Sequence, residues 1–124
     1  DDVYFGPHAW IYGLGGIDVE DEVVIGPFVT ISSIAHVRNH GSFRNGGSVR
    51  GKVSIGCGTW LAAHVSVAYG VKIGTGSLIA ANSAVVKNIP DNVIAGGVPA
   101  KVVKECEDKE AEIFSRFHEA NDRH

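Results

Sequence analysis

The sequence predicts a mainly-β domain in which very short strands stack into three-sided coils. Aliphatic residues recur at every sixth position from residue 55 to residue 85. Neither an α-helix, with a period of about 3.6, nor a single strand, with a period of about two, requires that spacing. Sixteen glycines among 124 residues are about twice the usual share and indicate many turns. A hydrophobic content of 44% with 20% charged residues is typical of one soluble globular domain.

Each six-residue unit supplies two side chains to the interior. The aliphatic positions are Ile55, Leu61, Val67, Ile73, Ile79 and Val85, and the residues two before them are Val53, Thr59, Val65, Val71, Ser77 and Ser83. Residues i and i−2 share one face of an extended strand, so both point inward. One unit cannot bury its apolar face alone, so the units must stack on one another.

The same phase continues towards the N-terminus. Its aliphatic positions are Phe5, Ile11, Val19, Ile25 and Ile31, and their partners are Val3, Ala9, Ile17, Val23 and Val29. The step from Ile11 to Val19 is eight rather than six, so the stretch YGLGGID carries two extra residues. The eleven units amount to just under four coils. A core this thin predicts that the chain associates with copies of itself.

Residues 35–52 interrupt the repeat. The stretch AHVRNHGSFRNGGSVRGK is polar and rich in glycine, and it carries Arg38, Arg44, Arg50 and Lys52 in an otherwise acidic chain. We expect an excursion loop that leaves the stack, and its length favours a functional role. A basic loop that is merely solvated is the alternative interpretation.

The repeat stops at NIPDNVIAGGVPAKVVKE, where two prolines and the Gly96–Gly97 pair indicate turns. Beyond it, apolar residues follow helical spacing with charged residues between them; they are Cys106, Ile113, Phe114 and Phe117. We therefore expect a repeat domain at 1–104, which includes the loop at 35–52. An amphipathic α-helix and tail are expected at 105–124.

Charge and cysteine content exclude several classes of protein. The net charge is −3 and the pI is about 6.0, so the whole molecule has no electrostatic case for binding nucleic acid. Cys57 and Cys106 match no metal-binding or redox spacing. No apolar run reaches the roughly 18 residues of a membrane span. No signal peptide is visible, so we expect a soluble, cytoplasmic protein.

The run IGTGSLIAANSAVVKNIPDNVIAGGVPAKVVKE, with IGCGTW before it, closely resembles the hexapeptide-repeat acyltransferases. More narrowly, it is similar to the branch that contains maltose and galactoside O-acetyltransferases and the polysaccharide and nodulation acetyltransferases. The resemblance covers residues 19–104. It implies a left-handed parallel β-helix of about four coils, a homotrimer as the active form, and acetyl-CoA as the donor. Periodicity alone does not give the handedness.

The resemblance also implies an O-acetyltransferase that acts on a sugar or similar small molecule, with His36 as general base. The family places its catalytic histidine four repeat lengths before a tryptophan, and His36 stands at that distance before Trp60. A pKa near neutrality suits histidine to take the proton of an acceptor hydroxyl. The hydroxyl is expected to attack the thioester directly, in a ternary complex without an acyl-enzyme. His40 is expected to bind the acceptor, or is the alternative base.

Other site residues follow from the same resemblance. Trp60 precedes the inward Leu61, so it should point outward, and it is expected to line the site near the thioester or the acceptor. A plain subunit contact is its alternative role. Ala63 and Ala81 occupy equivalent turns one coil apart, where backbone groups of the family hold the pantetheine arm. Three basic positions are expected to bind the phosphates of coenzyme A. They are Lys87, Lys101 and Lys104.

Two interpretations from other classes of protein are also open. A non-catalytic trimeric assembly module would share the prism and would not bind coenzyme A. A γ-class carbonic anhydrase uses the same prism with three zinc-binding histidines, for which His36, His40 and His64 are the candidates. That family's histidine pair has a longer spacing than this chain offers. We therefore expect no metal.

Overall fold

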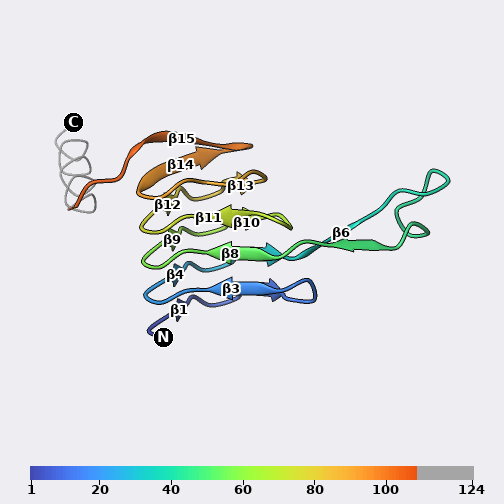
Figure 1. The fold of residues 1–124 in the computed structure, drawn as a ribbon, viewed down its shortest axis with the longest axis horizontal. Coiled ribbons are helices and arrows are strands. Elements are labelled where there is room, and N and C mark those ends of the chain that lie inside the picture. The colour runs from blue at the N-terminus through green and yellow to red at the C-terminus, as the bar shows by residue number, and fades with distance from the viewer. Residues whose placement is uncertain (109–124) are drawn as a thin grey trace.

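Residues 1–108 are described by the computed structural model, and they fold into a three-sided prism of short strands (Figure 1). The first side contains β1 (Tyr4–Phe5), β4 (Val24–Ile25), β9 (Trp60–Leu61), β12 (Leu78–Ile79), β14 (Val93–Gly97) and β15 (Ala100–Glu105). The second contains β2 (Trp10–Tyr12), β5 (Thr30–Ser32), β10 (Ser66–Val67) and β13 (Ala84–Val85). The third contains β3 (Ile17–Val19), β8 (Val53–Ile55) and β11 (Lys72–Ile73). The chain visits the three sides in turn, so each circuit forms one coil.

Strands of successive coils pair in parallel and keep one register. Trp60 pairs with Leu78, so one coil contains three six-residue units, as the repeat predicts. Tyr4 pairs with Val24, a step longer by two, and the two additional residues are the insertion predicted in YGLGGID. Val24 pairs with Trp60, a step twice the length of an ordinary coil. The excursion therefore adds the length of one further coil, and the chain returns to the stack in register.

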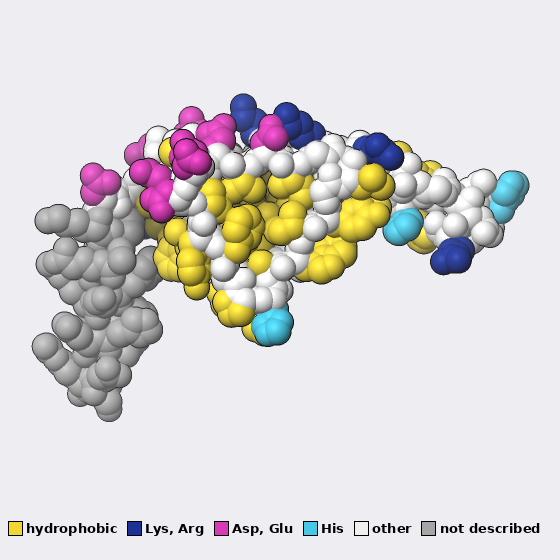
Figure 2. Space-filling view, turned by 90° about the horizontal axis from the view of Figure 1, so that it is seen from below, with side chains coloured by type: hydrophobic (Ala, Val, Ile, Leu, Met, Phe, Trp, Pro, Cys, Tyr) yellow, Lys and Arg dark blue, Asp and Glu magenta, His cyan; other side chains and the backbone are white. Residues whose placement is uncertain are grey.

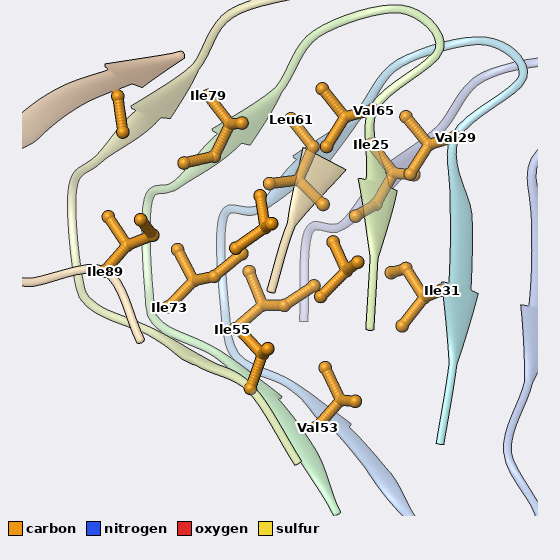
Figure 3. Packing of buried hydrophobic residues seen from close by; sticks show 14 of the residues in the cluster. Ile25, Val29, Ile31, Val53, Ile55, Leu61, Val65, Ile73, Ile79 and Ile89 are labelled. Atoms are coloured by element: carbon orange, nitrogen blue, oxygen red, sulfur yellow. The ribbon is translucent and has the colours of Figure 1, made fainter. Parts of the chain in front are cut away.

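The interior is a column of aliphatic side chains, and the inward positions predicted between residues 53 and 85 are confirmed. Each of them is at most 3% exposed, and several pack across the prism in Figure 3. Two polar members of the column are satisfied inside it. Thr59 Oγ1 donates a hydrogen bond to the Gly74 carbonyl at 2.6 Å, and Ser77 Oγ donates one to the Pro90 carbonyl at 2.8 Å. These bonds offset the cost of burying a hydroxyl.

The first coil departs from the predicted burial. Phe5 and Ile11 keep the inward register, since they pair with Ile25 and Ile31, yet they are 51% and 38% exposed. No described residue lies beneath this coil to cover them. Figure 2 looks onto this end of the prism and shows hydrophobic side chains gathered there. Their predicted inward direction is confirmed, but an inward direction buries a side chain fully only between two coils.

The C-terminal end of the described chain contains two strands that the sequence analysis missed. β14 pairs in parallel with β12 and antiparallel with β15, across a turn that contains the cis Val98–Pro99 bond. The expected helix lies outside the described residues except for 105–108, of which Glu105 ends β15. No helix among residues 1–108 is long and apolar enough to cross a membrane.

The excursion begins and ends in an antiparallel ribbon. β6 (Ile34–His36) pairs with β7 (Ser48–Arg50), and the ribbon projects from the second coil, away from the prism (Figure 1). The segment expected as a loop therefore carries two short strands of its own at its base.

We expect Leu61→Ala to lower the free energy of unfolding by about 2–5 kcal/mol, because it opens a cavity in a column whose neighbours are held by interstrand hydrogen bonds. Leu61 is fully buried. Ser66→Ala is the control, because Ser66 is exposed on β10, the next strand along the chain. We expect it to change the free energy of unfolding by no more than about 0.5 kcal/mol. Urea unfolding monitored by circular dichroism measures both. Equal effects would contradict the packing described above.

Candidate active site

His36 is the last residue of β6, and its side chain is exposed on the ribbon. It lies directly opposite Ser48 on β7, and the two side chains share one face of the ribbon. A histidine inside the stack would be packed among aliphatic side chains. The excursion instead holds this imidazole away from the core, where a substrate hydroxyl can approach it.

Ser33 fixes the point at which the excursion leaves the prism. Its side chain is fully buried, and its Oγ donates a hydrogen bond to the Tyr12 carbonyl at 2.7 Å. The Gly15 N–H donates to the same Oγ at 2.8 Å, and the Gly51 N–H donates to the Ser33 carbonyl at 2.8 Å. The exit and the return of the excursion are therefore tied together and to the turn of the coil below, close to His36 in the chain.

His40 lies further out, in a tight turn of the excursion. Asn39 and Ser42 exchange both backbone hydrogen bonds, at 2.9 and 3.0 Å, and His40 and Gly41 between them have positive φ angles of 48° and 76°. A two-residue turn with this geometry reverses the chain. His40 is exposed, and it is not on the paired part of the ribbon that carries His36.

Trp60 points outward from β9, as predicted, and is 43% exposed while Leu61 beside it is buried. Strand register places it in a column with Tyr4, Val24 and Leu78 on the outer surface of the first side. Tyr4 and Val24 are 58% and 38% exposed. The outer surface around Trp60 is therefore an apolar stripe, which an exposed protein face usually carries only where it contacts something.

The turns that hold Ala63 and Ala81 are stacked, as predicted. The Asn82 N–H, one residue after Ala81, donates to the Ala63 carbonyl at 3.0 Å, and the His64 N–H donates to the Pro27 carbonyl of the coil below at 3.0 Å. His64 and Asn82 have φ angles of 62° and 64°, the left-handed conformation that lets these N–H groups point along the prism. Ala63 and Ala81 place only small side chains at these two turns.

Three rings form a ladder along the same corner of the prism. His8, Phe28 and His64 occupy matching turn positions in successive coils, each with a positive φ. Their neighbouring ring centroids lie 5.0 Å apart, with interplanar angles of 17° and 2°. Sequence reasoning missed this ladder because the insertion and the excursion separate the three residues by unequal steps. His64 lies at the corner between the first and second sides, whereas the excursion that carries His36 and His40 leaves the prism between the second and third sides.

The three predicted phosphate-binding lysines lie at the C-terminal end of the described stack and are exposed. Lys87 follows β13, whereas Lys101 and Lys104 are on β15. β15 pairs Lys101 with Gly96 and Lys104 with Ile94, so both belong to the strand that follows the last coil. The basic candidates thus share the C-terminal end of the described stack, with Lys101 and Lys104 on the first side and Lys87 after the second side.

Cys57 lies on a different corner and is a poor nucleophile. Its half-buried position and the negative charges of Glu22 and Asp21 raise the pKa of its thiol, so the thiol is protonated at neutral pH. Within residues 1–108, no three histidine, cysteine, aspartate or glutamate side chains come together as a metal site requires. His36, His40 and His64 are thus not gathered within one chain.

Comparisons with known proteins agree with this geometry. The family model described as bacterial transferase hexapeptide (six repeats) matches residues 52–87. Galactoside O-acetyltransferase of Escherichia coli K12 is 38% identical over 98 residues, which are 79% of this chain and 48% of that protein. Galactoside O-acetyltransferase of Lactococcus lactis aligns over 47% of its own length. The chain therefore spans about half the length of these curated relatives.

Solved structures show the same fold. A galactoside acetyltransferase in complex with coenzyme A superposes with a TM-score of 0.77 at 33% identity, covering 90% of this chain and 58% of that one. A maltose O-acetyltransferase from Clostridium difficile 630 gives 0.70 at 29% identity, with 86% and 60% coverage. The prism is the left-handed parallel β-helix of these proteins. The chain belongs to the hexapeptide-repeat acyltransferase family, and the branch that it matches is that of the galactoside and maltose O-acetyltransferases.

We expect Ser33→Ala to lower the free energy of unfolding by about 1–3 kcal/mol, because it leaves the part-buried Gly15 N–H without its acceptor. Ser32→Ala is the matched control, since the hydrogen bonds of the Ser32 hydroxyl are local, with Ile34. Thermal unfolding measures stability, and hydrogen exchange of residues 34–50 measures how firmly the ribbon is held. Unchanged exchange in Ser33→Ala would contradict the anchoring role.

Proposed function

We propose that this protein is an O-acetyltransferase that moves an acetyl group from acetyl-CoA to a hydroxyl of a sugar or similar small molecule. The observation that carries the proposal is the exposed His36, held on an anchored ribbon beside a β-helix that matches a coenzyme A-bound galactoside acetyltransferase. Because the chain spans about half of its curated relatives, activity of the whole protein is part of this proposal.

In this proposal His36 acts as general base. An imidazole nitrogen takes the proton of the acceptor hydroxyl, and the oxygen attacks the thioester carbon. The carbon–sulfur bond then breaks, and the imidazolium returns its proton to the departing thiolate of coenzyme A. Both substrates are bound together, so no acyl-enzyme forms.

The donor arm is proposed to run along the corner formed by Ala63 and Ala81, whose small side chains leave room for pantetheine. The phosphates then lie near Lys87, Lys101 and Lys104, where an ammonium group acts as a point charge. The Ala63 carbonyl already accepts a hydrogen bond from the Asn82 N–H. A hydrogen bond from the pantetheine arm to the Ala63 carbonyl would share the oxygen with the Asn82 N–H.

Within one chain the excursion leaves the prism after the second side, whereas Trp60 lies on the first side. The acceptor is therefore proposed to lie between His36 of one subunit and Trp60 of a neighbouring subunit, with His40 as a further binding residue. Carbohydrate rings pack well on an exposed indole, which has a large apolar surface and a polar edge. The apolar stripe around Trp60 also supports self-association, and we propose a homotrimer with subunits in contact along this stripe. A cytoplasmic location, where acetyl-CoA is made and used, belongs to the same proposal.

We expect His36→Ala to lower kcat by about 10²–10⁴-fold, the usual contribution of a general base, and to leave the Kd for coenzyme A nearly unchanged. Release of free thiol from acetyl-CoA in the presence of acceptor sugars measures kcat, and calorimetric titration measures the Kd. His8→Ala is the control, because His8 lies in the first coil, outside the excursion and away from the turns of Ala63 and Ala81. Full activity in His36→Ala would remove the assignment of the base.

Lys101→Ala should raise the Kd for coenzyme A about tenfold, because one charge-assisted contact to a phosphate is lost. Titration with coenzyme A and with pantetheine, which has no phosphate, separates the two parts of the donor site. The variant should not change pantetheine binding. Failure of the wild-type protein to bind coenzyme A at all would favour a non-catalytic assembly module instead.

A further inference from the structure

The ribbon that carries His36 also carries unpaired positive charge. Arg38, Arg44 and Arg50 all belong to the excursion, and all three are exposed. The ion pairs among the described residues join Lys52 to Asp18 at 2.5 Å and the N-terminal amine to Asp21. None involves an arginine of the excursion. The local charge of this segment is therefore not neutralised within the described chain.

The sequence keeps acidic residues away from this segment. All fourteen aspartates and glutamates lie at residues 1–22 or from residue 91 onwards, so the charged side chains of the stretch 23–90 are all basic. A net charge of −3 hides this separation. An anion that approaches the ribbon meets no carboxylate from the same stretch of chain.

Strand register places one of the arginines beside the proposed base. Arg50 pairs with Ile34, and Ser48 pairs with His36, so Arg50 and His36 project from the same face of the ribbon. Arg38 is two residues beyond His36 in the chain. The hydrogen bond from the Val37 N–H to the Gly47 carbonyl, at 3.0 Å, still joins the two arms of the excursion at that point.

The opposite face of the ribbon has a different character. Ala35, Val37 and Val49 occupy it, and the two valines are 37% and 41% exposed. Arg50 therefore lies on the face of His36, opposite Ala35 and Val49. The Arg50 Cβ also lies against Gly15, where an added methyl group would come within 3.2 Å of it. The base of the Arg50 side chain is therefore held beside the prism.

We infer that the acceptor carries an anionic group, a carboxylate or a phosphate, which Arg38 and Arg50 bind while His36 takes the proton of a neighbouring hydroxyl. This inference rests on the proposed function and narrows its substrate class. The guanidinium group matches carboxylate and phosphate oxygens through paired N–H donors, which gives orientation as well as attraction. Two such groups flanking a base would fix which hydroxyl of the acceptor reaches the imidazole.

The test compares galactose, galacturonate and galactose 6-phosphate, each with acetyl-CoA; the three share their ring hydroxyls and differ in the group at carbon 6. We expect kcat/KM for one of the anionic acceptors to exceed that for galactose by about tenfold or more, mainly through KM, as charge-assisted hydrogen bonds provide. The preference should shrink as salt is added. Whichever anionic acceptor is preferred identifies the anionic group.

Arg38→Gln and Arg50→Gln should each bring the ratio of anionic to neutral kcat/KM towards one. Lys72→Gln is the control, because Lys72 is an exposed cation on β11, a strand of the stack outside the excursion. It should leave the ratio unchanged. Equal kcat/KM for charged and neutral acceptors in the wild-type protein would overturn the inference and leave the acetyltransferase proposal standing. A rise in KM for acetyl-CoA alone would overturn it by assigning the arginines to the donor.

A measurement without turnover separates the two proposals. Galacturonate titrated into ¹⁵N-labelled protein should shift the amide signals of His36 and Arg50 in the wild type, and not in Arg50→Gln. No shift in the wild type, with either galacturonate or galactose 6-phosphate, overturns the inference whatever the enzyme assay gives. Loss of the oligomer in both arginine variants, measured by light scattering, would assign these side chains to a subunit contact and also overturn it.

Discussion

Hydrogen bonding between successive coils at one fixed register is the constraint on which the rest of this structure depends. Because every coil pairs in parallel with the coil before it, the unit of the coil to which a residue belongs decides its side of the prism. The place of the residue within that unit decides whether its side chain points inward or outward. Trp60 is therefore aligned with Val24 and Leu78, and His8, Phe28 and His64 are stacked ring on ring.

That constraint also explains why the chemistry lies outside the stack. A side chain at an inward position is packed among aliphatic side chains. A side chain at an outward position lies between the side chains of the paired strands in the coils above and below. A segment that leaves the prism and returns in register escapes both limits without disturbing the coils. Ser33 makes this departure rigid, since its buried hydroxyl joins the exit of the excursion to Tyr12 and Gly15. A flexible exit would leave His36 without a defined position.

Charge follows the same division between stack and excursion. Carboxylates gather near the two ends of the sequence. Two of them, Glu22 and Asp21, come close to Cys57 in the fold and raise the pKa of its thiol. Arginines gather on the excursion, and Arg50 lies on the face that carries His36. The net charge of the whole chain therefore does not predict which acceptor binds, because an acceptor meets only the local surface.

The sequence by itself determined the six-residue period, the interior column from Val53 to Val85, the outward direction of Trp60 and the insertion near Gly13, since all of these depend on the spacing of neighbouring residues. Only the tertiary structure decided the pairing of β14 with β15, the exposure of Phe5, the anchoring by Ser33 and the side of the ribbon that Arg50 shares with His36. Three of these features join residues that are not neighbours in the sequence. The exposure of Phe5 depends on whether another coil covers it. Local periodicity carries no information about either, because strand pairing and burial are set by distant parts of the chain.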